Sequence, residues 1–144
     1  MIKVIVALLA FALLMYLLAG PTARAEKAKK LRAIADRFGS REPLAPDEFF
    51  DRYFPEPKYR REIVVGVRET LELILDSDLA FLRDSDDFSQ NLSLFWDFDS
   101  MANVELVQAL EDRFSIKIED NEAQQTHTVR QLIDLVHAKI GTAT

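Results

Sequence analysis

The chain has 144 residues, no cysteine and a formal net charge of -6. This length allows one ordinary domain, and the lack of cysteine excludes a disulfide, a thiolate nucleophile and a cysteine-ligated zinc site. The sequence is basic before Lys30 and acidic after it, which argues against nucleic acid as a partner and in favour of basic proteins.

The first predicted element is an almost unbroken apolar run over residues 2–19. Crossing a bilayer takes about 20 residues, within a range of about 17–25, so the run is at the short end. One interpretation is a retained signal anchor over residues 1–22. The other is a cleaved secretory peptide, because Ala23-Arg24-Ala25 follows the helix-breaking Gly20-Pro21 and has the small-x-small form of a cleavage site.

The charges around the apolar run favour the anchor. Lys3 and the amino terminus precede the run, and five basic residues follow it: Arg24, Lys27, Lys29, Lys30 and Arg32. The positive-inside rule then predicts a single-pass protein of the inner (cytoplasmic) membrane, with the remainder of the chain in the cytoplasm. Secretion after cleavage near Ala25 is the alternative.

Residues 23–43 are predicted to be a basic linker that continues the helix until Gly39-Ser40 and Pro43 interrupt it. Its basic side chains either lie on anionic lipid headgroups or form a solvated spacer. Residues 44–59 form the next segment, in which a short helix is predicted from Pro46 through Phe54. Its aromatic face either packs onto its own domain, docks a partner or caps a groove for an acyl chain.

Residues 60–144 are predicted to form the main domain, which begins with a helix over Glu62–Leu75. Its apolar residues recur at helical spacing: Ile63, Val64, Val67, Leu71, Ile74 and Leu75. The acidic clusters at residues 76–78 and 84–87 have neither the glycine nor the closing glutamate of a calcium loop. They are predicted to be solvent-facing turns.

The stretch over residues 98–118 is predicted to hold an amphipathic helix with a serine at its head. Asp99 is a good N-cap residue, which places Ser100 in the first turn beside the positive end of the helix dipole, where a phosphodiester is stabilised. The apolar positions are Met101, Val104, Val107, Ala109, Leu110 and Phe114. The polar positions are Asn103, Glu105, Gln108, Glu111 and Asp112.

The closing segments predict a brief extended link over residues 115–118 and a turn or two of helix at residues 120–125. Thr128 and Gln131 have the spacing of a capping box and mark the start of the last helix. His127 and His137 are the only histidines, and without a third ligand they are interpreted as surface or helix-end residues rather than a metal site. No catalytic motif is present.

Asp99-Ser100-Met101, continued at fixed spacing by VELVQALEDRF, the Ile-x-Ile link and Thr128-Val129, resembles the acyl carrier protein family. The resemblance is tight from Asp99 to about Ile140 and looser over residues 63–98. It implies an all-α fold, a small four-helix bundle with three long helices and one short one, here preceded by a transmembrane helix and a linker. It also implies a 4'-phosphopantetheine arm on Ser100, within a motif completed by Asp99 and Met101.

The same resemblance implies a carrier that is a substrate of enzymes and not itself an enzyme. It would hold an acyl or aminoacyl group as a thioester, near membrane enzymes of lipid or envelope modification. Glu105, Glu111 and Asp112 would face a phosphopantetheinyl transferase and acyl-transferring enzymes. The alternative is an unmodified carrier-like interaction module at the membrane.

The chain departs from the family's pattern just before the serine. Ordinary carriers read Asp-Leu-Gly-x-Asp-Ser, whereas here the loop after Asn91-Leu92 is about four residues longer, by an alignment good to a few residues, and lacks glycine. It carries Phe95, Trp96 and Phe98, which either pack in the core or shape what the arm can carry. Ala102 replaces a residue that is usually acidic in the family.

Overall fold

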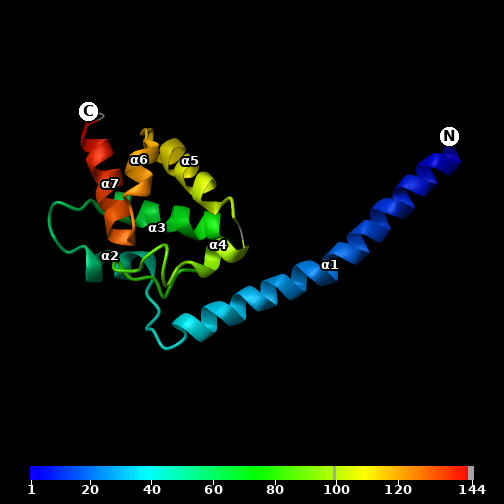
Figure 1. Ribbon diagram of the computed structural model, residues 1–144, viewed down its shortest axis with the longest axis horizontal. Coiled ribbons are helices and arrows are strands. Elements are labelled where there is room, and N and C mark those ends of the chain that lie inside the picture. Colours follow the sequence, from blue (N-terminus) through cyan, green and yellow to red (C-terminus); the bar gives the residue numbers. More distant parts are fainter. Residues whose placement is uncertain (99, 143–144) are drawn as a thin grey trace. The chain divides into compact units, whose positions relative to one another are not determined.

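The computed structural model describes residues 1–98 and 100–142, and the chain divides into two compact units, Met1–Gly39 and Ser40–Thr144. The first unit is one helix, α1 (Ile2–Phe38), drawn in blue to cyan in Figure 1. Gly20-Pro21 does not end this helix, so the expected break is wrong. The alanine-rich sequence that follows has a strong intrinsic preference for helix, which offsets the cost of an interior proline.

The regular elements among the described residues of the second unit are all helices, and the all-α prediction is confirmed. Three long helices and one short one form the expected bundle: α3 (Arg61–Leu75), α5 (Ala102–Phe114), α7 (Val129–Thr142) and the short α6 (Asp120–Gln124). Two further short helices are α2 (Pro46–Tyr53), which was predicted, and α4 (Leu94–Phe98), which was not. An isolated antiparallel bridge joins Asp87 to Thr128.

Helix α3 is the centre of the second unit, and α2, α5 and α7 all pack against it (Figure 1). The predicted stripe is buried except at Ile74, which is partly exposed. Gly66 lets α5 approach closely, because a Cβ at this position would lie 2.9 Å from Cζ of Phe114. The facing helices complete the core with Leu106, Leu110, Val129, Ile133 and Val136.

The aromatic segment at residues 44–59 packs onto its own domain, as the first of its three interpretations proposed. Phe49 and Phe54 are fully buried and Tyr59 nearly so. The guanidinium of Arg130, at the start of α7, lies 4.5 Å from the ring centroid of Phe54 and donates a 3.0 Å hydrogen bond to the Tyr59 hydroxyl. The segment is therefore an integral part of the folded unit.

Candidate functional site

Ser100 lies in a turn between α4 and α5, and its side chain is exposed. Helix α5 begins at Ala102 with Met101 as its N-cap residue. The prediction that Ser100 lies within the first helical turn is therefore wrong by two residues. Asp99, the predicted cap, lies outside the described residues, and the N-cap position belongs to Met101. An anion on Ser100 would still lie near the positive end of the α5 dipole.

Two apolar side chains close to Ser100 face solvent. Met101 is 55% exposed and Val104 is 63% exposed, although both were predicted on the apolar stripe of this helix. The buried stripe of α5 is instead Ala102, Leu106 and Leu110. A buried position explains why Ala102 is small where the family usually has an acidic residue, since a carboxylate there would lose its hydration.

The three acidic residues predicted to meet partner enzymes differ in their surroundings. Glu105 and Asp112 are exposed. The Glu111 side chain is only 15% exposed, and its Oε1 accepts a 2.8 Å hydrogen bond from the amide of Ile118. Glu111 therefore holds the link after α5 and has little of its carboxylate available to a partner.

A cavity of about 480 Å³ lies between α5, α6, α7 and the segment that precedes α4. Trp96 and Asn103, which line it, are four residues before and three residues after Ser100 in the chain. Most of its area comes from apolar side chains: Leu106, Val107, Leu110, Ile118, Leu132, Leu135, Phe88 and Trp96. The cavity is therefore an apolar compartment lined by residues that flank the exposed serine in the chain.

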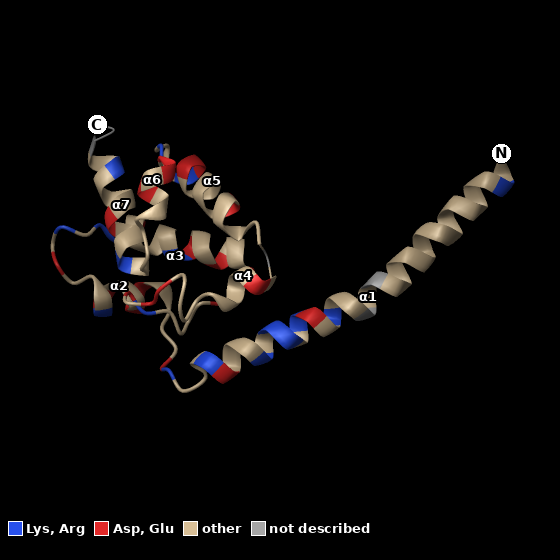
Figure 2. Cartoon of the chain, viewed as in Figure 1, with Lys and Arg blue, Asp and Glu red and all other residues tan. Residues whose placement is uncertain are grey.

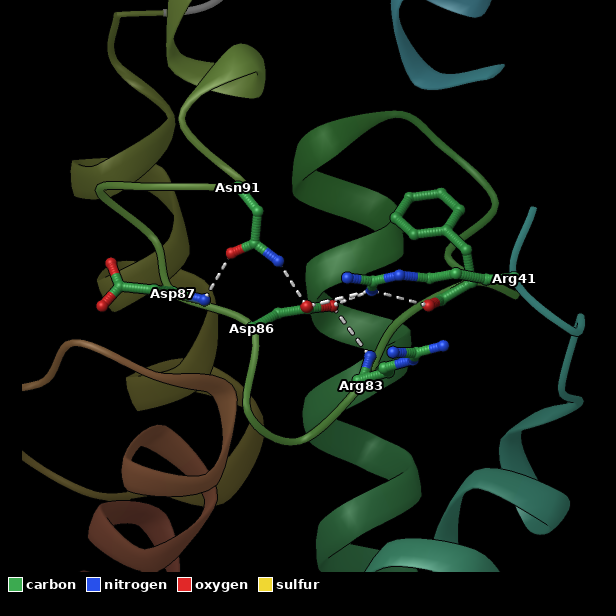
Figure 3. Close-up of polar contacts among 6 residues, drawn as sticks. Arg41, Arg83, Asp86, Asp87 and Asn91 are labelled. Atoms are coloured by element: carbon green, nitrogen blue, oxygen red, sulfur yellow. Dashed lines mark hydrogen bonds and ion pairs between the residues drawn. The ribbon is translucent and has the colours of Figure 1, made fainter. Parts of the chain in front are cut away.

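One wall of this cavity is held by a carboxylate that was expected to face solvent. Asp86 is 1% exposed, so the prediction that residues 84–87 form a solvent-facing turn is wrong for this residue. Its carboxylate accepts hydrogen bonds from the Arg41 guanidinium (2.9 and 2.8 Å), the Arg83 amide (2.8 Å) and the Asn91 side-chain amide (Figure 3). Burial of a charge is tolerated when it is paired and hydrogen-bonded in this way.

The same loop is fastened to the start of α7. The Phe88 amide donates to the His127 carbonyl at 2.9 Å, and the Val129 and Arg130 amides donate to the carbonyls of Asp86 and Asp84 at 3.0 and 2.8 Å. These bonds satisfy amides that have no acceptor within the helix. The loop that carries Phe88 and leads to Trp96 is thus fixed at both sides.

The predicted capping box at the start of α7 is confirmed. The Gln131 amide donates to Thr128 Oγ1 at 3.2 Å, and Gln131 Oε1 accepts from the amide of Thr128 at 3.2 Å and that of His127 at 2.7 Å. These bonds fix the N-terminal end of α7, where His127 lines the cavity.

The two histidines do not form a common site. His127 is exposed beside the cavity, whereas Nε2 of His137 accepts a 3.3 Å hydrogen bond from the Arg60 amide. Burial lowers the pKa of His137 below its ordinary value. Among residues 1–98 and 100–142, no group of three or more His, Asp or Glu side chains is placed to hold a metal ion.

Comparisons with known proteins agree on one family. Residues 66–136 match the family described as phosphopantetheine attachment site. A protein of Hordeum vulgare named "Acyl carrier protein 2, chloroplastic" is 31% identical to this chain over 117 residues, which cover 79% of this chain and 91% of the relative. Residues 66–136 include the last ten residues of α3, all of α5 and α6, and every residue that lines the cavity.

Proposed function

The chain belongs to the acyl carrier protein family, and from that premise we propose that it is a membrane-anchored carrier whose arm is attached to Ser100. Membership implies a covalently attached 4'-phosphopantetheine. The observation that carries the choice of residue is the exposed position of Ser100, in the turn between α4 and α5 and two residues before a helix that lines the apolar cavity. The attached arm supplies a thiol on which an acyl group is held as a thioester.

Loading Ser100 is chemistry that another protein performs on this chain. Transfer from coenzyme A forms a bond between Ser100 Oγ and phosphorus, breaks the pyrophosphate bond and releases adenosine 3',5'-bisphosphate, while the hydroxyl proton passes to the transferase. What this chain contributes is access to the hydroxyl and the α5 dipole, which stabilises the resulting negative charge. The carrier is therefore a substrate and partner of enzymes.

The cavity favours an acyl rather than an aminoacyl cargo. None of the side chains that line it is an aspartate or glutamate, so the ammonium group of an aminoacyl cargo would be desolvated without a counter-charge. A hydrocarbon chain gains from leaving water, by about 0.8 kcal/mol for each buried CH₂ group. The cargo we propose is accordingly a neutral acyl chain.

The surface around Ser100 supports docking of partner enzymes. Met101 and Val104 offer exposed apolar area, and Glu105 and Asp112 add negative charge on the same helix. Charges of this kind steer encounter with basic partners and fix orientation more than they add affinity. Glu111 is assigned a minor part because its carboxylate bonds to the Ile118 amide.

Membrane anchoring is supported by α1, which contains an 18-residue window of mean hydropathy 2.6 with none of it buried. A cleaved signal sequence passes the same test, and it remains the alternative, with a mature N-terminus at Glu26. The positive charge beyond the apolar run supports a retained anchor with the carrier in the cytoplasm. Figure 2 shows these Lys and Arg residues along the second half of α1, where anionic headgroups would attract them.

Intact mass measurement on the full chain, co-expressed with a pantetheinyl transferase, tests the attachment. We expect a mass increase that matches the arm, its loss in Ser100→Ala and its retention in Ser89→Ala, a control at another exposed serine. An unmodified chain in the presence of a competent transferase would instead support the alternative, a carrier-like interaction module.

The anchor has its own test. The chain has no cysteine, and Ser100→Ala removes the proposed attachment point of the arm's thiol. A single cysteine introduced at Ser115 of the Ser100→Ala variant therefore reports on which side of the membrane the second unit lies, through a thiol reagent that does not cross the bilayer. We expect the cysteine to be labelled only after the membrane of intact cells has been permeabilised. We also expect the protein to have the mass of the full chain. A mature chain that begins at Glu26 would refute the anchor, and it would count against loading of Ser100 because coenzyme A and the transferase are expected in the cytoplasm.

A further inference from the structure

The rings of Phe88 and Trp96 lie together on the cavity wall opposite α5. Their centroids are 6.1 Å apart and their planes differ by 22°, so the two rings stack nearly parallel to one another. Both residues line the cavity together with Leu106 and Leu110 of α5. We propose that this ring pair is a specificity-determining wall that contacts the cargo chain and selects extended hydrocarbon over short or charged cargo. The inference rests on the proposed carrier function and concerns the same cavity.

Ordinary core packing explains Trp96 less well than it explains its neighbour. Phe95 is 2% exposed and stacks on Phe81 at 6.5 Å with an interplanar angle of 6°, which is the behaviour of a core residue. Trp96, the next residue, is only partly buried and turns toward the cavity. The consecutive aromatic side chains thus divide between the core and the cavity.

The backbone that carries Phe88 and Trp96 is held in place by hydrogen bonds. The Phe88 amide is bonded to the His127 carbonyl at 2.9 Å, and the Trp96 amide to the Ser93 carbonyl at 3.0 Å. The Asp87 amide donates to Asn91 Oδ1 at 2.8 Å, and Asn91 in turn contacts the buried Asp86. Figure 3 shows how these residues tie the loop to Arg41. These bonds fix the backbone from which the two side chains project, and the stacking of the rings on each other limits the freedom that they would lose on contact with a chain.

The surface facing the rings has the character that a hydrocarbon chain requires. Leu106 and Leu110 lie on α5, Leu132 and Leu135 on α7, and Ile118 lies between the helices. A methylene chain between these residues and the ring pair makes dispersion contacts on both sides. Contact area increases with chain length, so the wall discriminates in favour of long chains. The loop bearing Trp96 is longer than the family's usual turn, which makes the wall a property of this chain.

Trp96 is the only tryptophan, so its fluorescence provides a direct test on the full chain in phospholipid nanodiscs. The holo-protein is loaded with hexadecanoyl, with 9,10-dibromohexadecanoyl, or with acetyl. We expect the brominated chain to remove most of the Trp96 emission relative to the unbrominated chain, because bromine quenches only at contact range. The matched control is the acetyl-loaded protein mixed with free dibromohexadecanoic acid, which reports quenching from the lipid alone. Equal quenching in these two samples would overturn the inference.

A second measurement asks whether the wall shelters the cargo. The rate at which hydroxylamine cleaves the thioester is compared for the native protein, Trp96→Ala, Trp96→Phe and Phe50→Ala, a control for loss of an aromatic side chain that does not line the cavity. We expect hydroxylamine to cleave the hexadecanoyl thioester several-fold faster in Trp96→Ala than in the other three proteins. The acetyl thioester should be cleaved at the same rate in all four. Equal hexadecanoyl rates in native protein and Trp96→Ala would refute a selecting wall.

These outcomes are separable from failure of the carrier assignment. If no holo-protein forms, the Ser100 proposal fails first, as mass measurement shows. If holo-protein and its thioester form but bromine does not quench above the lipid control, the wall alone fails. Trp96→Phe keeps an aromatic ring at this position. If hydroxylamine cleaves the hexadecanoyl thioester slowly in Trp96→Phe and rapidly in a folded Trp96→Ala, the difference is due to loss of ring contact and not to a folding defect.

Discussion

A single nitrogen of the Arg41 guanidinium, Nη1, contacts both oxygens of the Asp86 carboxylate, at 2.9 Å from Oδ1 and 2.8 Å from Oδ2. Asp86 is 1% exposed and the Arg41 side chain is 18% exposed. The pair joins the first residues of the second unit to the loop that forms one wall of the cavity, across 45 positions of sequence. The segment that follows α1 thereby contributes to the geometry of the cavity wall.

Arg41→Ala should destabilise the second unit by about 3 kcal/mol or more, because removal of one partner leaves a buried charge without its counter-ion. The measurement is urea unfolding of the full chain in a mild detergent. Arg52→Ala is the matched control, since the Arg52–Glu42 ion pair is exposed on both sides and should contribute at most about 1 kcal/mol. Equal effects of the two substitutions would contradict a structural role for the buried pair.

Ala102→Glu restores the residue type usual in the family, yet we expect it to destabilise the fold. Ala102 is 1% exposed, so the larger side chain overpacks the contact of α5 with the core and buries a carboxyl group, at a cost above about 2 kcal/mol. Val104→Glu, at a 63% exposed position two residues away, should leave stability nearly unchanged. Thermal unfolding followed by circular dichroism compares them. A neutral Ala102→Glu would mean that α5 shifts to expose this position.

Thr128→Ala should cost about 1 kcal/mol, the usual contribution of an N-cap side chain. The substitution removes the Oγ1 acceptor of the Gln131 amide but leaves Gln131 Oε1 to hold the amides of Thr128 and His127. Gln131→Ala removes the other half of the box and should cost a similar amount. Native-state hydrogen exchange of the first α7 amides would report the loss. Unchanged exchange in both variants would argue against the capping box.

His137 should make stability fall as the solution becomes acidic. Burial holds its pKa below the ordinary value, opposed by Asp134 and Glu62 and reinforced by Arg60 and Lys58. Below about pH 6.5, the ordinary value for histidine, the unfolded chain therefore binds more protons than the folded chain. Stability is then lost progressively until the pH passes the folded-state pKa.

The measurement is the slope of unfolding free energy between about pH 7 and pH 5. His137→Gln keeps a side-chain acceptor near the Arg60 amide and should flatten this slope, whereas His127→Gln, at an exposed position, should not. An unchanged slope in His137→Gln would assign the pH dependence to other groups.

Sequence pattern was sufficient for the helical elements whose signals are local. The apolar spacing of α3, the Pro46 start of α2 and the Thr128–Gln131 capping box each depend on residues within a few positions of one another. Sequence pattern was less reliable for the residue at which a helix begins when a long loop precedes that helix. Helix α5 begins after Met101 rather than after Asp99, and the residues before it include the separate helix α4, which the sequence pattern did not predict.

The all-α class and the resemblance to one family could be predicted from the sequence, since each depends on the spacing of residues close together in the chain. The tertiary structure was needed to show that Asp86 and Ala102 are buried and that the Glu111 carboxylate accepts a hydrogen bond from the Ile118 amide. It was also needed to show that Phe88 and Trp96 stack in the lining of one cavity. Burial and pairing depend on residues that are distant in the chain, and local spacing does not reveal them. The sequence around an aspartate does not show whether its carboxylate is hydrated or is paired, as Asp86 is, with an arginine 45 positions away.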